Sequence, residues 1–183
     1  MGGWSKLLLA VMGALVLAAS AYAALQGGAP RSAVLSGANV VGVSGDRDGS
    51  GTAQLRANVG KRSVCGWFTV SGLDAVSTVV VHEGGPGVTG GVVLVFAYPG
   101  PHGGFTDGVW YGCGTAPDGK RPTKALVKAL VQSPGGFYVS VQTAPYPAGA
   151  IRGQLTKPGK GAPKPGKPVK PAKPAPGAAK KTS

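Results

Sequence analysis

The sequence predicts an antiparallel all-β domain, built as a sandwich or a barrel, followed by a tail without packed structure. Glycine and proline are abundant, with 33 and 16 residues in a chain of 183. Short apolar or alternating segments recur between glycine- and proline-rich turns, as they do in antiparallel sheets. This composition excludes a coiled coil and argues against a mostly helical protein. An apolar share of 43% is enough for one hydrophobic core.

The first 23 residues have the features of a secretory signal peptide. A positive charge precedes an unbroken apolar run over 7–19, and small residues follow at Ala21 and Ala23. We therefore expect export, with cleavage after Ala23 and Ala21 as the alternative site. The alternative is an uncleaved anchor helix over 7–25, which is long enough to span a bilayer. In that case the signal segment would be the protein's one contact with a membrane.

The domain predicted over 35–156 contains six segments with the alternation or the β-branched and aromatic content of strands. They lie, in chain order, at 52–60, 65–70, 76–82, 92–98, 137–143 and 151–155. One helix is expected at 123–132, where apolar residues fall near one face and Pro134 follows. Residues 24–34 are expected to be a linker between the signal peptide and this domain.

Two cysteines, Cys65 and Cys113, remain after cleavage. An even count in an exported chain predicts a disulfide, and two reduced buried thiols are the alternative. Closing a loop of about 50 residues, the disulfide would contribute about 4 kcal/mol of stability. Cys65 lies two residues before Trp67, and Cys113 two after Tyr111. We therefore expect the disulfide to tie those two strands together beside the aromatic rings.

Residues 157–183 form a basic tail with seven prolines, eight lysines and no acidic residue. Such a segment cannot bury apolar surface, so we expect a disordered, largely polyproline-II arm. Its exposed charges predict electrostatic attachment to a polyanion, with a solubilising spacer as the alternative. Nucleic acid is not an expected partner, because the tail has no aromatic residues on which bases stack. The predicted polyanion contacts are Lys157, Lys160, Lys164, Lys167, Lys170, Lys173, Lys180 and Lys181.

Four segments between residues 35 and 156 occur in an order that resembles the CHRD domain, a module repeated in chordin and found singly in exported bacterial proteins. They are LSGANVVG, GDRDGSGTAQL, VSGLDAVSTVVVHEGGPGVTGGVVL and SPGGFYVSVQTAPYPAGAIRGQL. The PxGxIRGQL segment over 147–155 is the most specific part. The resemblance implies an extracellular, Greek-key-like β-sandwich, similar to superoxide dismutase or immunoglobulin domains. It implies no defined activity.

Two groups of residues resemble metal-binding sites, but each lacks ligands that such a site requires. The CHRD family commonly has an HxH pair in a central strand and a third histidine in a late strand. The matching positions here are Val80, His82 and Gln142, so one imidazole remains. A calcium loop would begin with Asp46 and Asp48 but has Ala57 where a bidentate glutamate is required. A hairpin turn is the preferred interpretation of that segment, and we expect no metal or other cofactor.

Three further residues are candidate ligand contacts: Trp67, Trp110 and Arg152. The tryptophans suggest a platform for stacking sugars, against the alternative that they pack in the core. Arg152 is the one charge in the closing strand. The preferred interpretation is a structural role, either in an ion pair or as a carbonyl clamp, in which the guanidinium binds backbone carbonyl oxygens. No serine lies in the frame of a catalytic nucleophile, and the six acidic residues show no spacing for glycoside hydrolysis. We therefore expect no enzyme.

Together these features predict a secreted, envelope-associated protein with a structural or binding role. The expected partner is an anionic cell-envelope polymer, or an extracellular protein or polysaccharide. A metal-binding or oxidative-defence protein and a polysaccharide-binding matrix component are the two alternatives.

Overall fold

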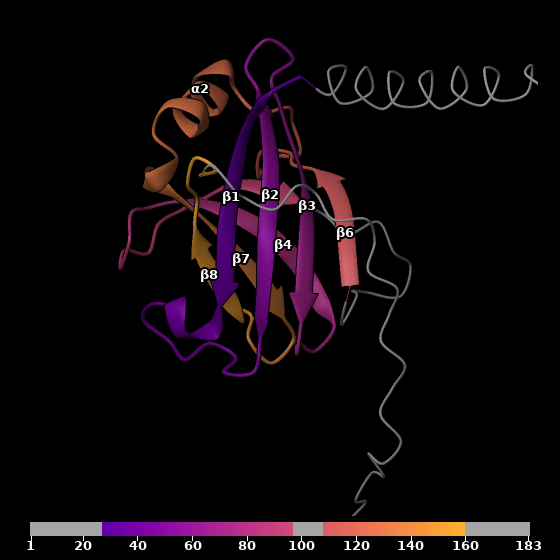
Figure 1. Cartoon of the computed structure of the whole chain (residues 1–183), viewed down its shortest axis with the longest axis vertical. Coiled ribbons are helices and arrows are strands. Elements are labelled where there is room, and N and C mark those ends of the chain that lie inside the picture. The colour runs from indigo at the N-terminus through magenta and orange to yellow at the C-terminus, as the bar shows by residue number, and fades with distance from the viewer. Residues whose placement is uncertain (1–26, 97–107, 160–183) are drawn as a thin grey trace, which may run out of the picture.

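The computed structural model describes residues 27–96 and 108–159. The predicted signal peptide 1–23, and the predicted tail from residue 160 on, lie outside the described residues. No helix in the described part is long and apolar enough to cross a membrane. The elements are β1 (Ala29–Ser36), η1 (Gly37–Asn39), β2 (Ser50–Asn58), β3 (Ser63–Ser71), β4 (Val76–Glu83), β5 (Val92–Phe96), β6 (Gly108–Cys113), α2 (Lys124–Gln132), η2 (Pro134–Gly136), β7 (Phe137–Thr143) and β8 (Ile151–Gln154) (Figure 1).

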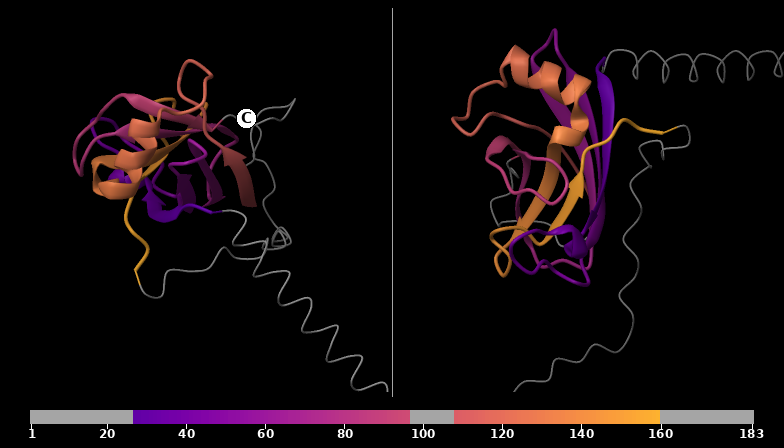
Figure 2. Two further views of the ribbon diagram at one scale, coloured as in Figure 1. Left: turned by 90° about the horizontal axis from the view of Figure 1, so that it is seen from above. Right: turned by 90° about the vertical axis from the view of Figure 1, so that its left-hand side faces the viewer.

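The strands form one antiparallel sheet in the order β5-β4-β7-β8-β1-β2-β3-β6, folded into two facing halves (Figures 1 and 2). The halves join at the β8–β1 seam, where Ser36 pairs with Arg152. On the other side, a bridge between Val95 and Thr115 nearly closes the sheet. Strands that are not consecutive lie side by side, since β3 pairs with β6 and β4 with β7. The predicted antiparallel β fold with one helix is confirmed.

The first strand corrects a predicted boundary. β1 begins at Ala29, inside the segment 24–34 that was predicted to be a linker, and pairs along its whole length with β2. Its inward positions are Arg31, Ala33 and Leu35, all of which are buried. Because an arginine occupies the first inward position, the polar–apolar alternation of this strand is hidden in the sequence. The six predicted strand segments correspond to β2, β3, β4, β5, β7 and β8.

The predicted helix is confirmed as α2, and both of its ends are satisfied by side chains. Thr123 caps the N-terminus, where its Oγ1 accepts a hydrogen bond from Leu126 N at 3.1 Å. Arg31 caps the other end by donating from Nε to Leu130 O at 2.9 Å, and from a terminal nitrogen to Val131 O. Burial lowers the pKa of the Arg31 guanidinium, which still stays charged at neutral pH. A cation at this position also complements the negative end of the helix dipole.

Candidate functional site

The aromatic residues of β3 and β6 point to opposite faces of the sheet. Trp67 is paired with Tyr111 across the two strands, and Phe68 with Trp110. Phe68 is fully buried, and the Trp110 ring stacks on it with centroids 5.2 Å apart. Trp110 also packs edge-on against Phe96, with centroids 6.5 Å apart. Of the two tryptophans predicted as ligand contacts, Trp110 therefore packs against the core and Trp67 lies on the outer face.

The predicted disulfide is present between Cys65 and Cys113, which face each other on β3 and β6. Trp67 and Tyr111 lie beside it on the same outer face, with ring centroids 4.6 Å apart and planes inclined at 48°. The Tyr111 hydroxyl lies 3.8 Å from Cys113 Sγ. The disulfide thus ties the two strands together next to an aromatic pair, as the sequence predicts.

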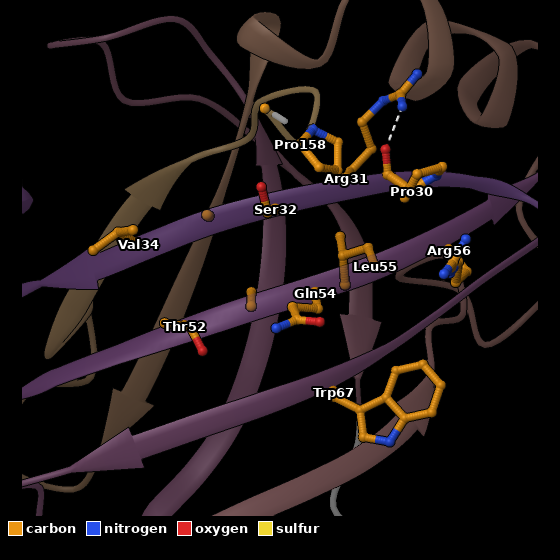
Figure 3. A pocket seen from close by; sticks show the side chains of 13 residues that line it. Pro30, Arg31, Ser32, Val34, Thr52, Gln54, Leu55, Arg56, Trp67 and Pro158 are labelled. Atoms are coloured by element: carbon orange, nitrogen blue, oxygen red, sulfur yellow. Dashed lines mark hydrogen bonds between the residues drawn. The ribbon is translucent and has the colours of Figure 1, made fainter. Parts of the chain in front are cut away.

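A shallow groove of about 340 Å³ crosses the outer face of β1, β2 and β3 (Figure 3). Figure 3 shows Thr52 and Gln54 on the central strand and Trp67 on β3. Pro158, from the segment that follows β8, borders the groove near β1. An aromatic ring beside hydroxyl and amide groups suits a ligand with both an apolar face and polar edges, such as a sugar ring.

Arg152 lies on the outer face of β8 and is only 5% exposed. Its guanidinium donates to the carbonyl oxygens of Gly85 at 3.1 Å and Val88 at 2.8 Å. It also lies 3.5 Å from the centroid of the Tyr138 ring. Arg152 is therefore a carbonyl clamp that holds the β4–β5 loop, residues 84–91, against the sheet. Buried in this way, its guanidinium is occupied by the protein itself.

Replacing Arg152 by methionine is expected to lower the free energy of unfolding by about 3 kcal/mol, because two carbonyls and a cation–π contact lose their partner. Chemical denaturation measures the change. Arg152→Lys should recover part of the loss, since a single ammonium cannot reproduce the planar fork. Arg47→Met, at an exposed position, serves as the control. Equal stability of Arg152→Met and the parent would show that the clamp contributes nothing.

The three positions at which the CHRD resemblance implies histidines share one face of neighbouring strands. His82 pairs with Tyr138 across β4 and β7, and Thr78 pairs with Gln142. Positions 80, 82 and 142 therefore all point outward, but the residues present are Val80, His82 and Gln142. Within the described residues, no three His, Cys, Asp or Glu side chains come close enough to hold a metal ion together.

His82 is held by neighbouring groups on the sheet. Its ring stacks on Tyr138, with centroids 4.7 Å apart and planes within 4°. Its Nδ1 lies 2.8 Å from Gly90 O, so it contacts the far end of the loop that Arg152 clamps. His82, Tyr138 and Arg152 come from three adjacent strands, with the Tyr138 ring on the middle one. This stacked row packs the loop against the outer face.

Asp46 and Asp48 lie in the connection between β1 and β2. The Asp46 carboxylate accepts a hydrogen bond from Asp48 N at 3.1 Å, which is an Asx turn. The Asp46 backbone N donates to Ala150 O at 2.8 Å and so ties this turn to the start of β8. The connection runs over 37–49 and is longer than the tight hairpin turn that the sequence suggested.

One cluster of side chains was not identified from the sequence. Lys61 and Arg62, in the turn between β2 and β3, border the same depression as Arg121, which lies some sixty residues later in the segment before α2. The GKRS segment signals a basic turn between two strands, but nothing in the local sequence brings Arg121 to it. The β3–β6 pairing brings these residues together.

One known family matches this chain. The family model described as the CHRD domain matches residues 31–155. The chain belongs to the CHRD domain family. The matched range begins inside β1, which agrees with the earlier domain start seen in the fold. No curated protein and no solved structure gives a match to the chain.

Three residues of the segment 147–155, the most specific part of this CHRD domain, have clear structural roles. Arg152 clamps the β4–β5 loop. Gly153 lets β8 approach β1, because a Cβ there would lie 2.1 Å from Val34 O. Gln154 Nε2 lies 2.8 Å from each of three carbonyl oxygens, in the β4–β5 loop, in η2 and at the start of β7. All three residues therefore hold the closing strand and its neighbouring loops in place.

Proposed function

We propose that this CHRD-domain protein is exported and has a non-catalytic binding role at the cell surface, where its lysine-rich tail attaches it to an anionic envelope polymer. The charge distribution carries the proposal, because residues 157–183 contain eight lysines and no acidic residue. Closely spaced exposed cations attract a polyanion without needing a preformed pocket. The non-catalytic role rests on the scarcity of acidic and histidine side chains, six and two in the chain.

The domain fixes the point from which the tail extends. Thr156 exchanges two backbone hydrogen bonds with Ser32 of β1, at 2.8 and 3.1 Å. Lys157 follows directly and is exposed, and Pro158 borders the groove of Figure 3. A polymer bound by the first tail lysines would therefore lie near the outer face of β1 and β2.

A second candidate function is the binding of polysaccharide on that face. The observation that favours it is the groove with Trp67 on one side, beside the Trp67–Tyr111 ring pair. Ring stacking and neutral hydrogen bonds are screened little by salt, whereas attraction between exposed charges falls steeply as salt rises. Salt dependence therefore separates the two candidates.

Cosedimentation with isolated cell envelope tests the proposal. Residues 24–183 are expected to bind at low salt and to lose about tenfold or more of the binding at about 0.5 M NaCl. The matched control is the same chain with the eight tail lysines replaced by glutamine, which keeps the length and the prolines. It should bind no better than residues 24–156.

Two outcomes would contradict the attachment by the tail. Equal, salt-resistant binding by all forms would favour the polysaccharide site on the domain. Absence of binding by every form would indicate a freely secreted protein.

A further inference from the structure

The end of the domain next to α2 contains a depression of about 570 Å³. Two segments border it, namely the turn between β2 and β3 and the segment 113–122 that leads from β6 to α2. Figure 1 shows this turn and α2 at the same end of the molecule. The lining residues are Lys61, Arg62, Ser63, Cys113, Gly114, Thr115, Arg121 and Pro122.

The charges at this depression all have the same sign. Lys61, Arg62 and Arg121 are exposed, and among the described residues no acidic side chain lines the depression. Within the described residues the only ion pair is between Lys120 and Asp118, at 3.1 Å. Among the described residues, Lys61, Arg62 and Arg121 therefore have no acidic partner. Three cations around one concave site produce a positive potential that attracts anions.

Arg62 has an unusual backbone conformation. Its φ of 49° lies in the left-handed region, and it is the only non-glycine residue with positive φ in the described part of the chain. Glycine or asparagine is the usual choice at such a position. The side chain donates from Nε to Pro122 O at 3.1 Å, which fixes the guanidinium between the two segments. Unfavourable backbone conformations of this kind are concentrated at functional sites.

The two segments are held together by covalent and backbone contacts. The disulfide between Cys65 and Cys113 joins β3, into which the turn leads, to β6, from which the segment 113–122 continues. Gly114 N donates to Val64 O at 2.8 Å, directly beside the disulfide. Because the frame is fixed before a ligand arrives, little ordering is required when an anion binds.

We propose that this depression is a binding site for the phosphate groups of an anionic polymer. Arginine presents a planar fork that matches the oxygens of a phosphate, and lysine adds a point charge. Each phosphate of a phosphodiester polymer carries one negative charge, so three neighbouring cations suit successive phosphates of such a polymer better than one isolated anion. The site lies on the folded domain and is separate from the tail. It shares with the proposed function only the polyanionic nature of the partner.

The test is an NMR titration of residues 24–183 with inorganic pyrophosphate, and with sulfate for comparison, at physiological salt. Saturable shifts are expected at the amides of 61–63 and of the non-proline residues in 114–121, with tighter binding of pyrophosphate than of sulfate. Arg121→Gln should raise the dissociation constant for pyrophosphate about tenfold, since one charge-assisted contact is lost. Arg47→Gln removes a charge that is also exposed, in the β1–β2 connection, and should leave the binding unchanged.

Arg62→Gly provides a second variant that preserves the turn. Glycine adopts the observed φ without strain, so the fold should be retained while pyrophosphate binding weakens. Shifts confined to the tail, equal effects of Arg47→Gln and Arg121→Gln, or tighter binding of sulfate would each overturn the proposal. The chain with its tail lysines replaced by glutamine should keep the shifts at 61–63. This readout distinguishes a failure of the site from a failure of attachment by the tail.

Discussion

Gly153→Ala is expected to prevent stable folding of the domain, with a loss of about 4 kcal/mol or more in the free energy of unfolding. An added Cβ would lie 2.1 Å from Val34 O and 2.8 Å from Leu35 Cδ2. The closer atom belongs to the backbone of β1, so no side-chain rotation relieves the clash and β8 must separate from β1. Separation at this seam opens the junction between the two halves of the sheet. Urea denaturation followed by circular dichroism measures the effect.

Gly135→Ala is the matched control for this substitution. A Cβ at Gly135 would meet no atom within 4 Å, so its stability should stay within about 0.5 kcal/mol of the parent. If Gly153→Ala were as stable as this control, the close approach of β8 to β1 could not be a requirement of the fold.

Removal of the disulfide is expected to lower the free energy of unfolding by about 4 kcal/mol, as estimated for the loop that it closes. Cys65 and Cys113 are separated by 48 positions in the sequence, so the cross-link strongly restricts the unfolded chain. The Cys65→Ala/Cys113→Ala protein and the parent in reductant should show the same shift in the urea midpoint. Adding reductant to the alanine variant should change nothing.

The disulfide also borders the proposed phosphate site. Cys113 is exposed and lines the depression, so the bond is accessible to a reductant. Loss of the cross-link should free the two segments that carry Arg62 and Arg121. A urea midpoint that does not move when reductant is added to the parent would contradict the stabilising role of the disulfide.

The tail and the proposed phosphate site would bind the same polyanion in two different ways. The lysines of the tail would make many exchangeable contacts, while the depression brings Lys61, Arg62 and Arg121 together. A polymer held by the arm would reach the domain as an intramolecular event, at a high effective concentration. Weak binding at the depression would then be sufficient to orient the domain on the polymer.

Local pattern predicted much of the fold. Alternation and β-branched content located six of the eight strands that the described residues form, and an amphipathic segment bounded by Thr123 and Pro134 located α2. The pairing of Cys65 with Cys113 followed from their number and from the expected export. Motifs over 35–156 were enough to identify the CHRD family. These features depend on the local sequence or on the composition, and both are known without knowledge of the fold.

Register and strand pairing decided the remaining features. Trp67 and Trp110 look equivalent in the sequence, but the pairing of β3 with β6 puts one outside and the other against the core. In the sequence Arg31 looks like a charge in a linker, whereas in the fold it donates to a carbonyl oxygen near the end of α2. Arg121 meets Lys61 and Arg62 only because non-consecutive strands lie side by side. These contacts join residues far apart in the chain, and the free energy that selects them comes from burial of the whole core rather than from any local segment.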